Sequence, residues 1–123
     1  MATFTRFEEI EAWKIARELT NSIYKMTNEK TFSRDYALKD QIRRAAISIM
    51  SNIAEGYGRR TNPEFIRFLN IANASAFEVK CQLYIAIDQG YIGKELFKTQ
   101  SELCNSICRK IGALTNYLRT QSS

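Results

Sequence analysis

Hydrophobic residues recur at steps of three and four residues in four separate stretches of the chain, with charged and polar residues between them. This spacing gives an α-helix one apolar face, so it predicts helices over residues 8–28, 33–56, 62–89 and 94–119, and no β-strand. The connections are short, so consecutive helices must run antiparallel. The pattern therefore predicts an all-α fold, an antiparallel up-and-down four-helix bundle, with residues 1–123 in a single domain. The positions expected in the core are Phe7, Ile10, Trp13 or Ala16, Leu19, Ile23, Met26, Leu38, Ile42, Ala45 or Ala46, Ile49, Ile53, Phe65, Leu69, Ala72, Ala76, Val79, Leu83, Ala86, Leu96, Gln100, Leu103, Ile107, Ile111, Leu114 and Leu118.

The breaks in this pattern carry residues that are typical of helix ends. Ser33 is a suitable N-cap for the second helix, and Asn62 followed by Pro63 is a typical start for the third. Gly56 and Gly58 are expected to end the second helix, because glycine adopts the left-handed backbone that often closes a helix.

A second set of apolar residues lies off the core stripes of the two central helices. These residues are Ile47, Met50, Phe68, Ile71 and Ile85. They are either part of a wide core stripe with scattered exposed residues, or an interface between subunits. A second apolar row on two adjacent helices is more than scatter, so we favour the interface and expect a homo-oligomer.

The loop that follows the second helix combines charge with an aromatic ring. It contains Tyr57, Arg59 and Arg60, and in an up-and-down bundle it lies at the same end as both termini. Arg6 and Arg119 belong to that end, and Arg67 lies one turn into the third helix. Arginine binds phosphate bidentately and a ring can stack on a base, so these six residues are the expected nucleic-acid contacts. The alternative is a solubilising patch that complements the negative end of the second helix.

The overall charge allows such a partner without requiring one. Eighteen Lys and Arg residues against 13 Asp and Glu residues give a net charge of +5 and a pI near 9.2. Many soluble proteins carry as much positive charge.

Two further charged residues sit close to the apolar stripes of the central helices. Arg44 and Glu78 come near one another when the chain folds back at residues 56–61, so they are expected to form a partly buried ion pair. Arg43 is expected on a solvated or interface face instead.

The chain lacks most of the residues on which catalysis depends. It has no histidine, which removes the commonest general base and metal ligand. Phosphate-binding and glycine-rich dinucleotide loops are also missing. Cys81, Cys104 and Cys108 would allow a three-thiolate site, but cysteine packs well as a small apolar residue and a fourth ligand is missing. We therefore expect no enzyme, no metal and no cofactor.

The chain also gives no sign of a membrane or secretory location. It contains no apolar run of about 18 residues, and its N-terminus lacks an apolar signal core. Three cysteines in such a chain are most simply reduced thiols, so a cytoplasmic location is expected.

The stretch QIRRAAISIMSNIAEGYGRR at residues 41–60 resembles a known family, the four-helix bundle proteins encoded in intervening sequences of bacterial 23S ribosomal RNA genes, or S23 family. Residues 64–72 and 82–86 continue the match, and Phe7-Glu8 with Trp13 and Ala16 matches the first helix. Met50 stands where the family usually has proline. The resemblance implies an antiparallel four-helix bundle that forms a five-subunit ring. It also implies kinship with the accessory variability determinant of diversity-generating retroelements, which binds a reverse transcriptase and nucleic acid. It supplies no catalytic residues.

Three functional hypotheses follow from these observations. The first is a nucleic-acid-binding oligomer that uses the arginine-rich end. The second is an oligomeric adaptor whose partner is a protein, such as a retroelement reverse transcriptase. The third, an enzyme, has the missing histidines against it. Salt-dependent binding to RNA or DNA separates the first two, because phosphate contacts release counterions.

Overall fold

The computed structural model describes residues 4–121, which form four long α-helices and two short 3-10 turns. The helices are α1 (Glu11–Thr27), α2 (Tyr36–Tyr57), α3 (Asn62–Asp88) and α4 (Lys94–Arg119), and the turns are η1 (Phe7–Glu9) and η2 (Phe32–Arg34). Residues 4–121 contain no strand. The predicted all-α class is confirmed. The first helix begins three residues later than expected, because residues 7–9 form the 3-10 turn instead of a first α-helical turn.

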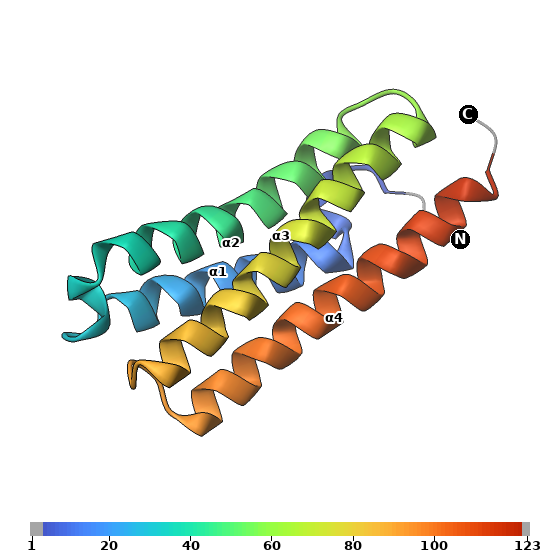
Figure 1. The fold of residues 1–123 in the computed structure, drawn as a ribbon. Coiled ribbons are helices and arrows are strands. Elements are labelled where there is room, and N and C mark those ends of the chain that lie inside the picture. The colour runs from blue at the N-terminus through green and yellow to red at the C-terminus, as the bar shows by residue number, and fades with distance from the viewer. Residues whose placement is uncertain (1–3, 122–123) are drawn as a thin grey trace.

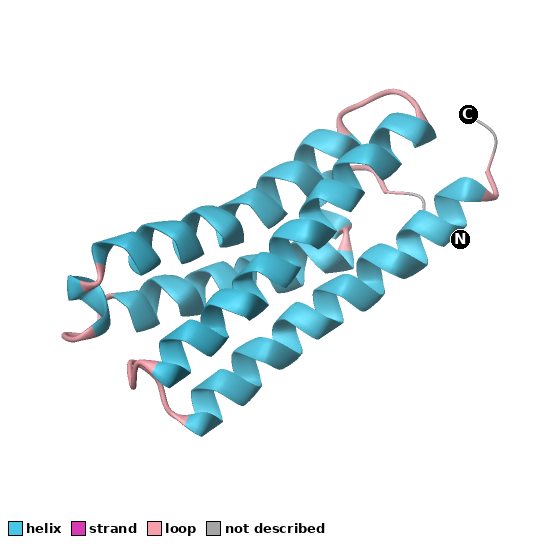
Figure 2. Cartoon of the chain, viewed as in Figure 1, coloured by secondary structure: helices cyan, strands magenta, loops and turns pink. Residues whose placement is uncertain are grey.

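The four helices form an antiparallel up-and-down bundle in which each packs against two neighbours. α1 contacts α2 and α4, and α3 contacts α2 and α4. Successive helices alternate in direction (Figure 1), and the loops are confined to the two ends (Figure 2). We call the end that holds residues 4–9, 58–61 and 118–121 the α2–α3 end, and the other the far end. No helix within the described residues is long and apolar enough to cross a bilayer.

The core consists of the apolar stripes that the periodicity predicts. The predicted residues of α2 and α3 are all buried. Burial of a large aliphatic side chain contributes about 1.5–3 kcal/mol, so these stripes supply the main drive for helix association. The clearest exception is Leu96 in the first turn of α4, which is exposed because the bundle ends there.

The N-caps of α2 and α3 differ from the predicted residues. Asp35, not Ser33, caps α2, and its Oδ1 accepts a hydrogen bond from the Leu38 amide at 3.1 Å. Thr61, not Asn62, caps α3. In both places the chain offers two polar residues close together, and the backbone of the preceding turn decides which one reaches the free amides.

Gly58 ends α2 as its C-cap, as expected, but with a right-handed backbone at φ −72°, so the expected left-handed geometry is wrong. Gly56 lies inside α2, and a Cβ there would come within 2.7 Å of the Phe68 Cβ. Its role is to let α2 and α3 approach closely. Among the described residues only Gly90, after α3, has a positive φ, at 77°.

The far end is closed by aromatic residues from the connections. The ring of Phe32 is fully buried and stacks on Tyr91 at 5.0 Å. The Tyr91 hydroxyl donates a 2.9 Å hydrogen bond to Asp35 Oδ2, which raises the pKa of Tyr91. Helical periodicity cannot predict this contact because both rings lie outside the α-helices.

Candidate nucleic-acid interface at the α2–α3 end

Two of the predicted contact arginines at the α2–α3 end cover a buried ring. The guanidinium carbons of Arg59 and Arg67 lie 4.8 and 4.6 Å from the centroid of the Phe68 ring. Phe68 is only 7% exposed, so it belongs to the interior of the chain and not to an apolar surface row. Arg59 and Arg67 therefore contact the interior of the protein as well as solvent. Their cation–π contacts hold both side chains in fixed, exposed positions.

Each of these arginines also pairs with a carboxylate on its own helix or at its end. Arg59 Nη2 lies 3.2 Å from Glu55 Oε2, and Arg67 donates to both carboxylate oxygens of Glu64 at 3.2 and 3.3 Å. The hydrogen bonds from Arg67 lower the pKa of Glu64 and raise that of Arg67. Together with Glu8 and Glu9, these carboxylates nearly balance the arginines. The α2–α3 end is thus less basic than its arginines alone suggest.

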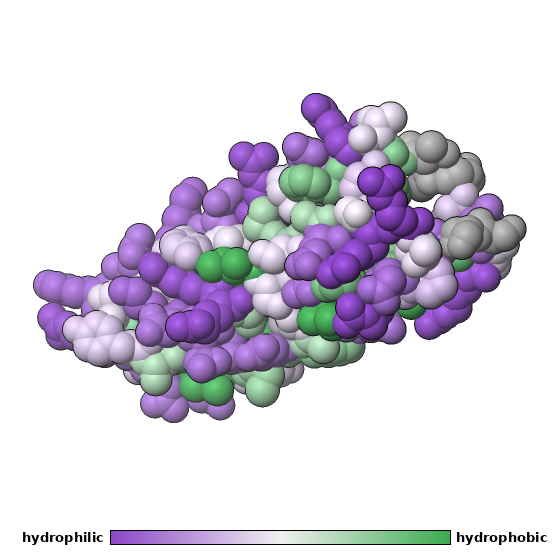
Figure 3. Space-filling model, turned by 90° about the horizontal axis from the view of Figure 1, so that it is seen from above, coloured by the Kyte–Doolittle hydropathy of each residue, from purple (hydrophilic) through white to green (hydrophobic). Residues whose placement is uncertain are grey.

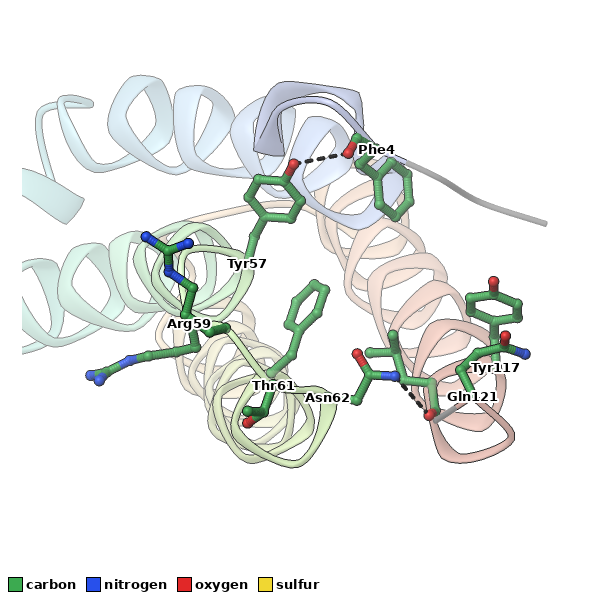
Figure 4. Close-up of a pocket in the computed structure, with 10 residues that line it drawn as sticks. Phe4, Tyr57, Arg59, Thr61, Asn62, Tyr117 and Gln121 are labelled. Atoms are coloured by element: carbon green, nitrogen blue, oxygen red, sulfur yellow. Dashed lines mark hydrogen bonds between the residues drawn. The ribbon is translucent and has the colours of Figure 1, made fainter. Parts of the chain in front are cut away.

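Tyr57 acts as a structural residue at this end. Its hydroxyl donates a 2.9 Å hydrogen bond to the Phe4 carbonyl, and its half-buried ring meets Phe65 edge-on at 6.2 Å (Figure 4). This arrangement fastens the N-terminal segment to the end of α2. The sequence led us to expect a ring that is free to stack on a base, but in the structure this ring is engaged within the protein.

A hollow of about 400 Å³ opens between the loop and the C-terminal turn of α4. It is lined by Phe4, Tyr57, Arg59, Arg60, Thr61, Asn62, Phe65, Tyr117, Leu118 and Gln121. Within the described chain, no acidic residue lines it. The Arg59 side chain turns away from the hollow (Figure 4), and its guanidinium lies over Phe68 and beside Glu55.

A second hollow of about 490 Å³ adjoins the first at the end of α4, and Asn62, Leu118 and Gln121 line both. Arg119 lines it, and again no described lining residue is acidic. Arg119 makes one long hydrogen bond, at 3.5 Å to Asn116. Arg60 is exposed and makes no hydrogen bond or ion pair with another residue of the 4–121 range. Arg6 is exposed beside Glu9. Hydrogen bonds from Thr5 are the main cause of the lowered pKa of Glu9, and the charge of Arg6 lowers it further.

The predicted buried pair of Arg44 and Glu78 is wrong, because both side chains are exposed. A 2.9 Å hydrogen bond between Ser48 and Ser75 fixes the register of α2 against α3. This register brings Arg44 and Glu78 to similar levels, but both point outward. The Glu78 carboxylate accepts a hydrogen bond from Gln82 at 3.3 Å.

Arg43, expected on a solvated or interface face, instead joins α2 to the end of α1. Its Nε donates to Thr27 Oγ1 at 2.8 Å and its Nη2 to Asn28 Oδ1 at 3.0 Å. The guanidinium carbon also lies 4.2 Å from the centroid of the Tyr24 ring.

The five residues predicted for an interface are only partly at the surface. Ile47, Ile71 and Ile85 are 42%, 40% and 43% exposed, whereas Met50 is half-buried against the core. On the face drawn in Figure 3, hydrophobic residues lie singly or in small groups among hydrophilic ones. Two larger exposed rings, Phe77 and Tyr84, were missed because they belong to neither apolar row.

Cys104 and Cys108 lie one turn apart on α4, but the three cysteines differ in burial. Cys104 is buried, Cys108 is half-buried and Cys81 is exposed. Burial raises the pKa of Cys104 to about 12 and also raises that of Cys108. Across the described residues, no group of three His, Cys, Asp or Glu side chains could hold a metal ion.

Comparison with known proteins assigns the chain to a family. A crystal structure from Bacteroides thetaiotaomicron, of a protein with unknown function from the S23 ribosomal protein family, matches with a TM-score of 0.79 and 23% identity. The match covers 85% of this chain and 95% of the other, and it supports the bundle fold alone. No curated protein matches significantly. The family model described as 23S rRNA-intervening sequence protein matches residues 8–113, so the chain belongs to that family, as the resemblance indicated.

Proposed function

We propose that this protein is a non-catalytic nucleic-acid-binding protein that contacts phosphates at its α2–α3 end. One observation carries the proposal. Two adjoining hollows at that end are lined by Arg59, Arg60 and Arg119, and none of their described lining residues is acidic.

The arginines differ in how they would act. Arg60 and Arg119 are exposed and lightly bonded, so they can turn toward a phosphate. Arg59 and Arg67 are held over Phe68, which lowers the entropy lost when a ligand binds. An arginine paired with a carboxylate keeps further donors free, because the guanidinium has five. Side-chain amides that line the hollow, such as that of Gln121, add neutral hydrogen-bond donors for the phosphates.

A single α2–α3 end would bind weakly, because its carboxylates offset much of the positive charge. Affinity at physiological salt therefore requires several ends acting on one strand. We propose that association through the exposed isoleucines supplies this repetition, and the family resemblance suggests five subunits. A symmetric assembly places the same end of each subunit at equivalent positions.

A protein-binding adaptor is the second candidate. The observation that favours it is the set of exposed apolar side chains on α3, Ile71, Ile85, Phe77 and Tyr84. Such side chains are typical of protein interfaces, and direct protein docking does not depend on counterion release.

Binding of a fluorescein-labelled single-stranded RNA of about 12 nucleotides, followed by fluorescence anisotropy, tests the proposal. RNA is the first probe because the family description refers to a 23S rRNA-intervening sequence. We expect affinity to fall steeply between about 50 and 200 mM salt. Arg59→Ala with Arg60→Ala should weaken binding by about ten-fold and reduce the slope of log K against log salt by about 1.4.

The matched control is Lys30→Ala with Arg34→Ala, which removes the same charge from the far end, where both residues are exposed. This control should bind RNA nearly as tightly as the unmodified protein. Equal losses from the two double variants would show that only net charge matters. Unchanged affinity and salt slope in the Arg59 and Arg60 variant would overturn the proposal and leave the adaptor ahead.

A further inference from the structure

A groove of about 390 Å³ runs between α3 and α4 beside the α2–α3 end, where the two helices lie next to each other (Figure 1). The residues that give it chemical character are Asn70, Asn73 and Phe77 from α3, and Gly112, Thr115 and Asn116 from α4. We call it the asparagine groove. Arg119 lines both this groove and the neighbouring hollow at the α2–α3 end, so the two adjoin at this side chain.

We propose that the asparagine groove binds one nucleobase of a single strand. The base would stack on Phe77, asparagine amides would bond its edge, and Arg119 would hold the adjoining phosphate. This inference rests on the proposed function, because the strand would arrive from the phosphate contacts at the α2–α3 end.

Phe77 provides the stacking surface. It is 59% exposed, although a phenyl ring normally gains from leaving water. It makes no ring contact with any other aromatic residue of the described chain, in contrast to Tyr84, which packs edge-on against Phe97 at 4.9 Å. Every base has a flat face that stacks on such a ring, whatever its sequence.

The asparagines provide the hydrogen bonds. Asn70, Asn73 and Phe77 are spaced three and four residues apart, so they share one face of α3. Neither the Asn70 nor the Asn73 amide bonds to another residue within the described part of the chain. An amide carries both donors and an acceptor, which suits the mixed edge of a base. None of the described residues that line the groove is acidic, so nothing there repels a phosphate.

Thr115 contributes one of four buried side-chain oxygens in the described chain that have no hydrogen-bond partner, and the only one of the four in a residue that lines this groove. It is 5% exposed, and its Oγ1 has no hydrogen-bond partner among the residues that the structure describes. A threonine in a helix usually bonds to a carbonyl of the preceding turn, as Thr20 and Thr27 do here. Because an unpaired buried hydroxyl is unfavourable, a ligand group that pairs with it once the side chain rotates toward the groove would be stabilised.

Gly112 keeps the groove open. A Cβ at this position would have no atom within 4 Å, so packing against the rest of the chain does not require glycine. Glycine is nonetheless one of the least favourable residues for the middle of a helix. Its presence in α4 is explained if the space in front of it receives a ligand.

The first test uses RNA and follows from these contacts. Phe77→Ala should weaken binding of the labelled single-stranded RNA by about ten-fold, and Phe77→Tyr should bind normally. Gly112→Leu should weaken binding similarly while leaving the protein at least as resistant to urea, because leucine favours the helix and its side chain meets open space. The control is Tyr36→Ala, which removes an exposed ring at the far end and should bind normally.

The second test uses a single nucleotide, which can occupy the groove without any contact with the loop arginines Arg59 and Arg60. In saturation-transfer difference NMR, uridine 5′-monophosphate should receive saturation at its base protons from the unmodified protein, and much less from Phe77→Ala and Gly112→Leu. Equal saturation from all three proteins would overturn the groove even if RNA binding survived. A response to N-acetylalanine methylamide but not to the nucleotide would overturn it in favour of a peptide site. Conversely, saturation of the nucleotide without any RNA binding would contradict the proposed function and support base binding in the groove.

Discussion

Glycine occupies two helical positions of opposite character, Gly56 in α2 and Gly112 in α4. A Cβ on Gly56 would lie 2.7 Å from the Phe68 Cβ and 3.0 Å from the Phe65 ring, both on the facing helix. A Cβ on Gly112 would meet nothing within 4 Å. One residue type thus serves close helix packing in one place and an open groove in the other.

The same substitution should therefore change stability in opposite directions. Gly56→Ala should lower the free energy of unfolding by about 1–3 kcal/mol, because α2 and α3 must move apart. Gly112→Ala should raise it by about 0.5–1 kcal/mol through helix propensity. Urea unfolding followed by circular dichroism measures both, and a change of equal sign would contradict this account.

The Cys104 thiol should make stability fall at alkaline pH. Burial raises its pKa from the ordinary value of 9.0 to about 12, so the folded protein keeps a proton that the unfolded chain loses. Its contribution is complete below pH 9 and is lost as the pH rises toward 12. The raised pKa of Tyr91 acts in the same direction.

Cys104→Ala should accordingly show a shallower loss of stability above pH 9 than the unmodified protein, by about 1.4 kcal/mol per pH unit. At neutral pH the variant should itself be less stable, because it leaves a small cavity. Urea unfolding between neutral and alkaline pH provides the measurement. Cys81→Ala, which removes an exposed thiol, should keep the original slope.

At the scale of the helices, side-chain contacts at both ends of α2 set how it packs on its neighbours. Asp35 caps its start and Arg59 returns from its end to Phe68 on α3. Arg43 reaches from its first half to Thr27 and Asn28, at the C-terminal end of α1. The negative end of a helix favours such a cation.

Arg43→Ala should lower the free energy of unfolding by about 1.5–3 kcal/mol, because two charge-assisted hydrogen bonds and the contact with Tyr24 are lost. Arg44→Ala, one residue further along α2, is the matched control. It should change stability by less than about 0.5 kcal/mol, since Arg44 is exposed. A large loss in the control would restore a role for Arg44 in an ion pair.

At the scale of the whole molecule, we infer from the exposed isoleucines that the bundle associates into an oligomer. Ile71 and Ile85 lie fourteen residues apart on α3, with Glu78 midway between them, so they share one outward row. Ile47 stands on α2. Removing such side chains from water would stabilise an assembly at about 25 cal/mol per Å² of apolar surface.

Light scattering at micromolar concentration should give a mass that is a multiple of 14.2 kDa. Ile71→Asp with Ile85→Asp should shift the mass toward that of one chain, because charges at the interface would be buried without partners. Tyr36→Asp, at an exposed position of the far end, should not. A single 14.2 kDa species in the unmodified protein would exclude the assembly.

The sequence by itself determined the helices, their order and the residues of the core. These features depend on local spacing, such as the seam from Phe65 to Ala86, and on connections that allow only antiparallel neighbours. Local spacing does not decide the helix boundaries, as Asp35 and Thr61 show, because neighbouring polar residues compete for the same cap.

Only the tertiary structure decided what each polar side chain contacts. Arg43 donates a hydrogen bond to α1 while Arg44 stays exposed. Arg59 covers the Phe68 ring, although it lies in a loop. The asparagine groove was not predicted either, although the helical spacing of Asn70, Asn73 and Phe77 is visible in the sequence. The physical reason is that adjacent helical positions point about 100° apart, so a small rotation of one helix against the next exchanges a buried contact for an exposed one.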